Sequence, residues 1–235
     1  MSPGLKQGGN KMSKLRYGIP MLLAALASAP VAAQQGAADN HGYFGVGLML
    51  STDTQSSNVG GDVTSRGGGV VLNGAGILSA GEGIGFGLNG SMDIGSRTYD
   101  DADVTDTEFQ MSFDGGVVLI DLLYLSLGLQ FLNQTDDQTD IMRTYMVVPF
   151  GVGVLAGNEE GYLLGQLRFG GGQLSNDQDS TTEDVGYFGL RVMGQTGTAN
   201  GLQFMGGIEF DSYDYADFDY TDNIFRFFFG LGFGG

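Results

Sequence analysis

The sequence has no cysteine, only four prolines among 235 residues, and a single histidine, His41. Without cysteine the fold uses neither disulfides nor thiolate metal sites. We interpret the lone histidine as an ordinary solvated residue. Beyond residue 33 no apolar run reaches the ~20 residues that a membrane-spanning helix needs, which excludes a helical inner-membrane protein.

Lysine is also missing after residue 14. From Gln34 onwards, 27 acidic residues oppose six arginines and no lysine, which gives this part of the chain a net charge of −21. Such a surface repels nucleic acid and other anionic polymers. We therefore expect no nucleic-acid partner.

The N-terminal segment has the composition of an export signal. Four basic residues precede the short apolar run 19–26, and small residues occupy most of 27–33. This pattern predicts a signal peptide over 1–33, cleaved before Gln34, and one mature domain over 34–235. Met12 is an alternative start, because the residues that follow it still supply a basic region.

The last strand shows the pattern that organises the mature chain. From Phe225 to Phe233 every second residue is large and apolar, whereas the residues between are Arg226, Phe228 and two glycines. A period of two is typical of a β-strand with two different faces. No amphipathic helix accompanies the strands to cover their apolar faces, so we expect lipid to cover them. A sheet in lipid must close, because an open edge leaves backbone groups unpaired.

Ten alternating segments follow His41, each predicted at about ten to thirteen residues. Short turns alternate with long polar connections, which is typical of outer-membrane barrels. The pattern predicts an all-β fold: a closed up-and-down antiparallel transmembrane β-barrel of about ten strands, with eight as the alternative. A soluble lipocalin-like barrel would turn its large apolar residues inward, but here the strand-borne charges fall in the glycine-rich register. The long connections are predicted at 51–65, 100–106, 134–140, 175–183 and 213–220.

From Phe44 to Phe233 the chain resembles the small outer-membrane β-barrel proteins of Gram-negative bacteria, with no specific subfamily indicated. Residues 225–233 look like the aromatic C-terminal strand that such proteins present to the barrel-assembly machinery, although this chain continues to Gly234 and Gly235. The resemblance implies an outer-membrane location, with membrane lipids and lipopolysaccharide as neighbours.

The bulky register is predicted to face lipid. Because the sequence has no tryptophan for the girdles at the membrane interfaces, tyrosines such as Tyr43, Tyr99 and Tyr162 are expected there. Representative lipid-facing residues are Phe86, Phe113, Leu125, Leu127, Phe227, Phe229 and Phe233.

The other register is predicted to place a charge network inside the lumen. Estimated hairpin register puts Arg97 beside Glu108 and Arg226 beside Glu209. A transverse field along a small pore is one interpretation, and a network that plugs the lumen is the other. Barrels of about eight strands are filled with side chains, so we favour the plug. The predicted network is Asp93, Arg97, Glu108, Asp114, Arg143, Arg168, Arg191, Glu209, Asp211 and Arg226.

Three of these arginines are predicted to form one basic wall. Arg143, Arg168 and Arg191 fall on consecutive strands, with Asp93 and Asp114 on another wall.

The carboxylate pair Asp93 and Asp114 offers acid–base chemistry in principle, but salt bridging explains the pair more simply. We therefore expect no enzyme.

The exterior connections are rich in aspartate. Oxygen-rich clusters suit Ca²⁺ or Mg²⁺, yet no stretch matches a calcium-loop motif, so solvated loops without a cofactor are the default. Tyrosines interleaved with acids at 213–220 suggest a rim for a small ligand or partner. The weak metal candidates are Asp100, Asp101, Asp103, Asp217 and Asp219.

These observations favour a non-enzymatic membrane protein, either a structural surface protein or a narrow, porin-like passive conduit. One alternative is a binding or adhesion module that acts through the acidic loops. The other is a hydrolase of lipid or peptide at the outer surface.

Overall fold

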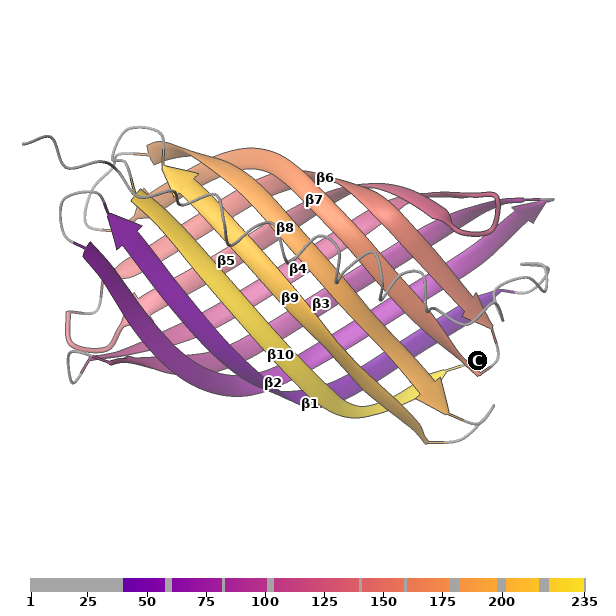
Figure 1. Ribbon diagram of the computed structural model, residues 1–235, viewed down its shortest axis with the longest axis horizontal. Helices are drawn as coiled ribbons and strands as arrows, with labels where there is room; N and C mark the ends of the chain where they lie inside the picture. The colour runs from indigo at the N-terminus through magenta and orange to yellow at the C-terminus, as the bar shows by residue number, and fades with distance from the viewer. Residues whose placement is uncertain are drawn as a thin grey trace, which may run out of the picture. The chain divides into compact units, whose positions relative to one another are not determined.

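A computed structural model describes residues 40–57, 61–81, 83–100, 104–139, 141–158, 160–177, 182–197, 202–215 and 220–234. The predicted signal peptide lies outside these residues. Ten antiparallel strands form one closed barrel, in which each strand pairs with its sequence neighbours and the last pairs with the first (Figure 1). The predicted fold class and strand count are confirmed. The strands are β1 (His41–Ser57), β2 (Gly61–Gly81), β3 (Ile84–Tyr99), β4 (Thr105–Leu119), β5 (Leu123–Asp136), β6 (Met142–Asn158), β7 (Gly161–Asn176), β8 (Thr182–Gly197), β9 (Gln203–Tyr215) and β10 (Tyr220–Gly234).

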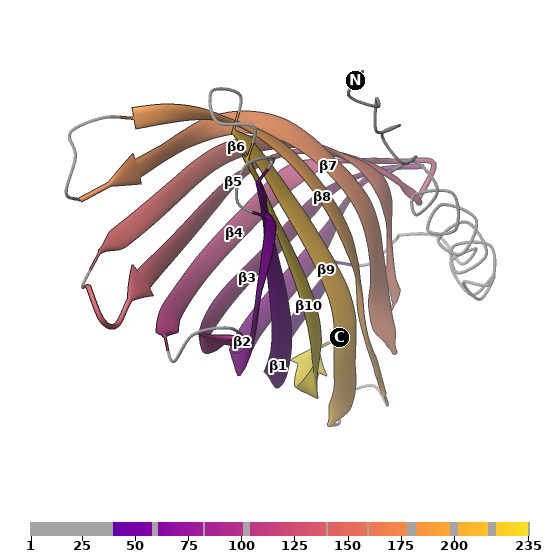
Figure 2. The same cartoon turned by 60° about the vertical axis from the view of Figure 1, so that its left-hand side comes forward.

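The register of the ladder sets the tilt of the strands. β1 closes on β10 with Phe44 opposite Phe233. We start at Gly42 of β1 and step from each residue to its paired residue on the next strand. After one circuit of the barrel the path returns to β1 at Thr54, about 12 residues further along the strand. Such a stagger tilts strands by roughly 35–45° from the barrel axis, and Figure 2 shows them running obliquely around the wall. With ten strands the lumen is narrow.

The strands are longer than predicted. They range from 13 residues in β9 to 21 in β2, so part of each predicted exterior connection belongs to the wall. Residues 51–57 of β1, for example, pair with 61–67 of β2. The predicted loop at 51–65 is wrong because polar residues keep the two-residue alternation, with Ser51 and Asp53 buried inside.

The outer face of the wall carries a belt of large apolar side chains, called here the apolar belt. Towards one end of the barrel polar residues such as Thr54, Ser96 and Asn223 replace them. The described residues include no helix long and apolar enough to cross a membrane. Of the predicted lipid-facing residues, Leu125 is partly exposed. The exposed ones are Phe86, Phe113, Leu127, Phe227, Phe229 and Phe233.

The two ends of the barrel differ. One end carries the connections β2–β3, β4–β5, β6–β7 and β8–β9, and is called here the short-turn end. The opposite end, called here the mouth, is the one towards which polar residues replace the apolar belt. Both described chain ends lie at the short-turn end, since Tyr43 of β1 pairs with Gly234 of β10.

Side chains fill the interior between these ends. Near the short-turn end an apolar cluster includes Tyr124, Leu155 and Phe228. Towards the mouth, a second cluster includes Tyr145 and Tyr213. Buried charged and polar residues occupy the region between the two clusters. The lumen is therefore packed along its length.

Inward glycines make room for large neighbours rather than leaving open space. A Cβ added at Gly87 would lie 2.7 Å from the ring of Tyr124, and one added at Gly207 would lie 2.6 Å from the ring of Phe228. The Tyr124 hydroxyl donates to the Gly87 carbonyl oxygen at 3.3 Å. These glycines accept the aromatic rings that fill the narrow lumen.

The predicted tyrosine girdle is wrong. Tyr43 and Tyr162 are buried inside the barrel, with ring centroids 4.8 Å apart, and the Tyr43 hydroxyl donates to the Asn158 carbonyl at 2.7 Å. Tyr99 donates to Asp106 Oδ2 at 2.7 Å. The prediction failed because these tyrosines belong to the inward register of their strands. Inside the barrel their hydroxyl groups find hydrogen-bond partners in the protein.

Candidate functional site

The predicted charge network lies in the packed middle of the lumen. Nine of its ten members are buried, and Arg143 is only partly buried nearer the mouth. Alternation along the strands places them there, since their neighbours in the sequence face outward. The buried members are Asp93, Arg97, Glu108, Asp114, Arg168, Arg191, Glu209, Asp211 and Arg226.

Arg191 forms the densest set of contacts across the lumen. From β8 its Nη1 lies 3.1 Å from Asp114 Oδ2 on β4, and its Nε donates to Glu209 Oε1 on β9 at 2.8 Å. The same guanidinium donates to Asn89 at 2.9 Å and to Ser112 at 2.6 Å. All these partners are buried, so the guanidinium is held from several sides of the ring.

Arg168 joins this group to the tyrosines. Its Nη1 donates to Gln130 Oε1 at 2.6 Å and to the Tyr187 hydroxyl at 3.0 Å. The Tyr187 hydroxyl in turn donates to Asp211 Oδ1 at 2.5 Å. Arg168 Nε also lies 3.5 Å from Asp114 Oδ1, so one carboxylate serves two arginines.

A second pair of arginines shares Glu108. Arg97 Nε lies 3.0 Å from Glu108 Oε2, and Arg226 also pairs with Glu108. Arg226 Nη1 lies 2.8 Å from Asp211 Oδ2. Because Asp211 also accepts from Tyr187, all four buried arginines belong to one connected network.

Two predicted details of the network concern the arrangement of its charges on the strands. Arg226 lies directly opposite Glu209 in the ladder, but its ion pairs are with Glu108 and Asp211. The predicted register is confirmed, whereas the ion pairs form with other carboxylates because long side chains in a narrow lumen reach diagonally and across. The three arginines of the predicted basic wall lie on the consecutive strands β6, β7 and β8, and the two aspartates lie on β3 and β4, as predicted. The two walls meet across the lumen, since Arg168 and Arg191 both contact Asp114.

Carboxylates outnumber guanidinium groups in the interior. Eight Asp and Glu residues are buried against four arginines. Asp93 forms no ion pair with another described residue, although it is only 2% exposed. A buried carboxyl group without an ion pair is costly, so the network is not optimised for stability at Asp93.

Sequence reasoning missed Asp53 as a member of the network. Arg97 Nη1 lies 2.7 Å from Asp53 Oδ2, and both side chains are buried. The signal was present, because Asp53 continues the inward register of Met49 and Ser51. Its polar surroundings instead indicated a loop.

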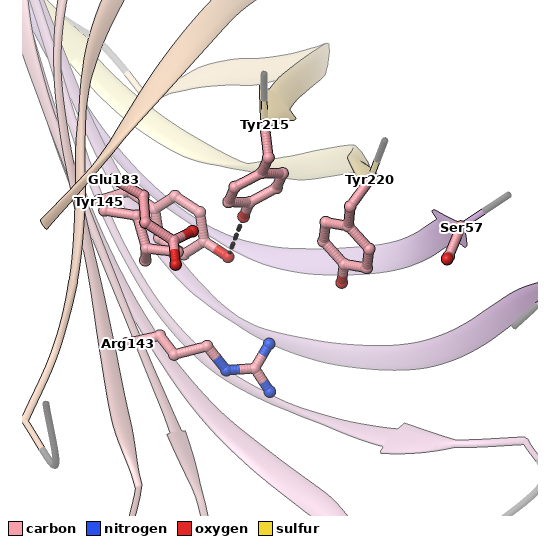
Figure 3. A pocket seen from close by; sticks show the side chains of 7 residues that line it. Ser57, Arg143, Tyr145, Glu183, Tyr215 and Tyr220 are labelled. Carbon is pink, nitrogen blue, oxygen red and sulfur yellow. Dashed lines mark hydrogen bonds between the residues drawn. The ribbon is translucent and has the colours of Figure 1, made fainter. Parts of the chain in front are cut away.

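A cavity of about 390 Å³ lies at the mouth, above the network. Figure 3 shows Arg143 reaching from β6 towards the space between Tyr220 and the hydrogen-bonded pair Tyr145 and Tyr215. The Tyr215 hydroxyl donates to the Tyr145 hydroxyl at 2.6 Å, and the rings of Tyr215 and Tyr220 are 4.9 Å apart. The lining residues are Ser57, Arg143, Tyr145, Leu174, Glu183, Tyr215 and Tyr220.

Asp100, the metal candidate that the structure describes, is not part of a metal-binding cluster. Asp100 pairs with Arg66 at 3.2 Å on the outside of the barrel, while Asp101, Asp103, Asp217 and Asp219 lie outside the described residues. Within the described ranges no group of three potential metal ligands occurs. His41 begins β1 at the short-turn end, whereas the cavity residue Ser57 ends the same strand at the mouth.

Fold and interior together define the class: a closed ten-stranded antiparallel β-barrel with an apolar outer belt and a lumen filled by an ionic network. The sequence matches no family model and no curated protein.

Solved structures similar to this chain are Gram-negative outer-membrane β-barrels. The translocator domain of the autotransporter NalP from Neisseria meningitidis is 12% identical, with 94% of this chain and 97% of that chain covered and a TM-score of 0.43. The outer membrane protease OmpT from Escherichia coli is 10% identical, with 84% and 96% covered and a TM-score of 0.41. Ail, the attachment invasion locus protein of Yersinia pestis, is 13% identical, with 82% and 99% covered and a TM-score of 0.35.

Proposed function

We propose that this protein is a non-enzymatic barrel of the bacterial outer membrane that is closed by its own side chains. The observation that carries the proposal is the contact between Arg191 and Asp114, which joins strands on different sides of the lumen. Apolar side chains fill the lumen on both sides of this contact. A structural surface protein fits this arrangement better than a passive conduit, because hydrophobic clusters occupy the lumen on both sides of the charged network.

The apolar belt supports the membrane location. Leu127 is 63% exposed and Phe233 is 56% exposed on the outer face, whereas arginines are buried inside. Exposing this much apolar surface to water is unfavourable at about 25 cal/mol per Å², so hydrocarbon is the solvent that suits this face. A soluble barrel would have the opposite arrangement.

The orientation follows from how such a barrel is made. In this proposal the signal peptide over 1–33 directs export, and the aromatic β10 is presented to the barrel-assembly machinery. Both chain ends then lie on the periplasmic side, and the mouth faces outward next to lipopolysaccharide. At the mouth the strands extend past the apolar belt. The polar rim of the mouth therefore lies above the membrane surface.

Catalysis is not part of the proposal. The interior arginines are committed to carboxylates, and His41 is at the end opposite the mouth. A binding role at the mouth is the second candidate function, and the cavity beside Arg143 favours it.

Ion conductance of the refolded mature chain in planar bilayers tests the closed lumen. We expect a flat current trace at protein levels where a general porin gives many steps. A heat-shifted band on unboiled gels from the same vesicles establishes that the barrel is folded and inserted. Reproducible, steady current steps from the folded wild-type protein would contradict the proposal.

A further inference from the structure

Arg143 differs from the other arginines in the described part of the chain. Arg66, Arg97, Arg168, Arg191 and Arg226 each form an ion pair, but Arg143 forms none with a described residue. Its guanidinium instead lines the cavity at the mouth (Figure 3). A partly buried cation without an ion pair is available for a ligand anion.

The same cavity carries an opposite charge. Glu183 of β8 lines it together with Arg143 of β6, yet the two side chains form no ion pair with each other. A purely anionic ligand would be repelled by Glu183 and by the acidic surface of the chain. A purely cationic ligand would be repelled by Arg143. A small molecule with both charges satisfies both side chains.

Aromatic faces supply the remaining wall. Tyr145, Tyr215 and Tyr220 surround the space between the two charges (Figure 3), and tyrosine rings attract ammonium groups through cation–π interaction. The tyrosines are held in place, since Tyr215 donates to Tyr145 and Tyr145 donates to Asp222 Oδ2 at 3.3 Å. A volume of about 390 Å³ is in the range of small-ligand pockets.

We propose that this cavity binds a small zwitterion with a carboxylate at Arg143 and an ammonium group between Glu183 and the tyrosine rings. An amino acid or a betaine has this chemistry. The floor of the cavity is the packed tyrosine cluster, so the ligand binds at the mouth and is not transported through the barrel. Ligand binding at the mouth is an addition to the proposed closed barrel. It does not depend on whether ions cross the lumen.

Isothermal titration of the folded mature barrel with glycine betaine and with glycine tests the site. We expect saturable binding of at least one of them, with acetate and tetramethylammonium each at least about tenfold weaker. Arg143→Gln and Glu183→Gln should each weaken binding by about tenfold or more, as expected for the loss of a charge-assisted contact.

Matched variants separate a local effect from a change in total charge. Arg66→Gln removes an exposed arginine that is paired with Asp100 outside the cavity, and Glu160→Gln removes an acid at the β6–β7 turn. Both should bind like the wild type, and all variants should retain the heat-shifted band. The proposal is overturned if neither zwitterion binds saturably, if acetate alone binds as tightly, or if folded Arg143→Gln and Glu183→Gln bind unchanged.

Discussion

Arg191 and Asp114 meet at 3.1 Å although four strand-to-strand steps separate β8 from β4 around the ring. Such a contact spans the lumen, and both side chains are fully buried. A guanidinium in this position is held by Glu209, Asn89 and Ser112 as well. The pair therefore fixes the wall strands to one another and obstructs the channel at the same time.

Arg191→Ala should lower the stability of the folded barrel by about 3–5 kcal/mol, because two buried carboxylates, Asp114 and Glu209, lose their closest arginine and keep only longer contacts to Arg168. Arg168→Ala should act in the same direction. The measurement is the urea midpoint in detergent, together with the heat resistance of the folded band on unboiled gels. Arg143→Ala is the matched control and should change little, since Arg143 forms no ion pair with a described residue. Equal effects at Arg191 and Arg143 would argue against the network.

Asp93→Asn and Asp211→Asn should have opposite outcomes. Asp211 binds Arg226 and accepts from Tyr187, so neutralising it removes an ion pair and lowers the urea midpoint. Asp93 forms no ion pair among the described residues, and its replacement removes a buried carboxyl group that has no ion-pair partner. The midpoint of Asp93→Asn should stay the same or rise. A loss comparable to that of Asp211→Asn would show that Asp93 has a stabilising partner.

Gly87→Leu tests whether the lumen is full. The new side chain would point into the ring of Tyr124, and overpacking of this kind costs about 1–3 kcal/mol. Gly76→Leu, one step away in the ladder, is the control because a Cβ there meets nothing closer than 3.9 Å. Thermal unfolding should be earlier for Gly87→Leu only. If both variants unfold like the wild type, the interior has free space.

The β4–β5 turn is a place where the protein can be stabilised. Ile120 and Asp121 both have positive φ, at 49° and 58°, and the Leu122 amide donates to the Leu119 carbonyl at 3.1 Å. This is the geometry in which Asn-Gly is preferred. The double substitution Ile120→Asn with Asp121→Gly should gain about 1 kcal/mol, read as a higher urea midpoint. An unchanged or lower midpoint would contradict this description of the turn.

The strand alternation predicted the faces of the wall well and the side-chain partners poorly. Phe227 and Arg226 were assignable to opposite faces because a period of two is a local property. The partner of Arg226 depends on barrel closure and stagger, which bring β4 within reach of β10, and no local pattern encodes that distance. Asp53 was missed for a related reason, since a polar strand above the apolar belt has the composition of a loop. The cavity at Arg143 combines residues from several strands and has no signature in any one of them.

The central claim is that the bulky register faces hydrocarbon, and single tryptophans test it most directly because the chain has none. In vesicles, the fluorescence of Leu127→Trp should be strongly quenched by lipids brominated in the middle of their acyl chains and little affected by iodide. Ser96→Trp, on the same outer face but beyond the apolar belt, should show the reverse. A Leu127→Trp protein that is quenched by iodide and insensitive to brominated lipid would contradict the account.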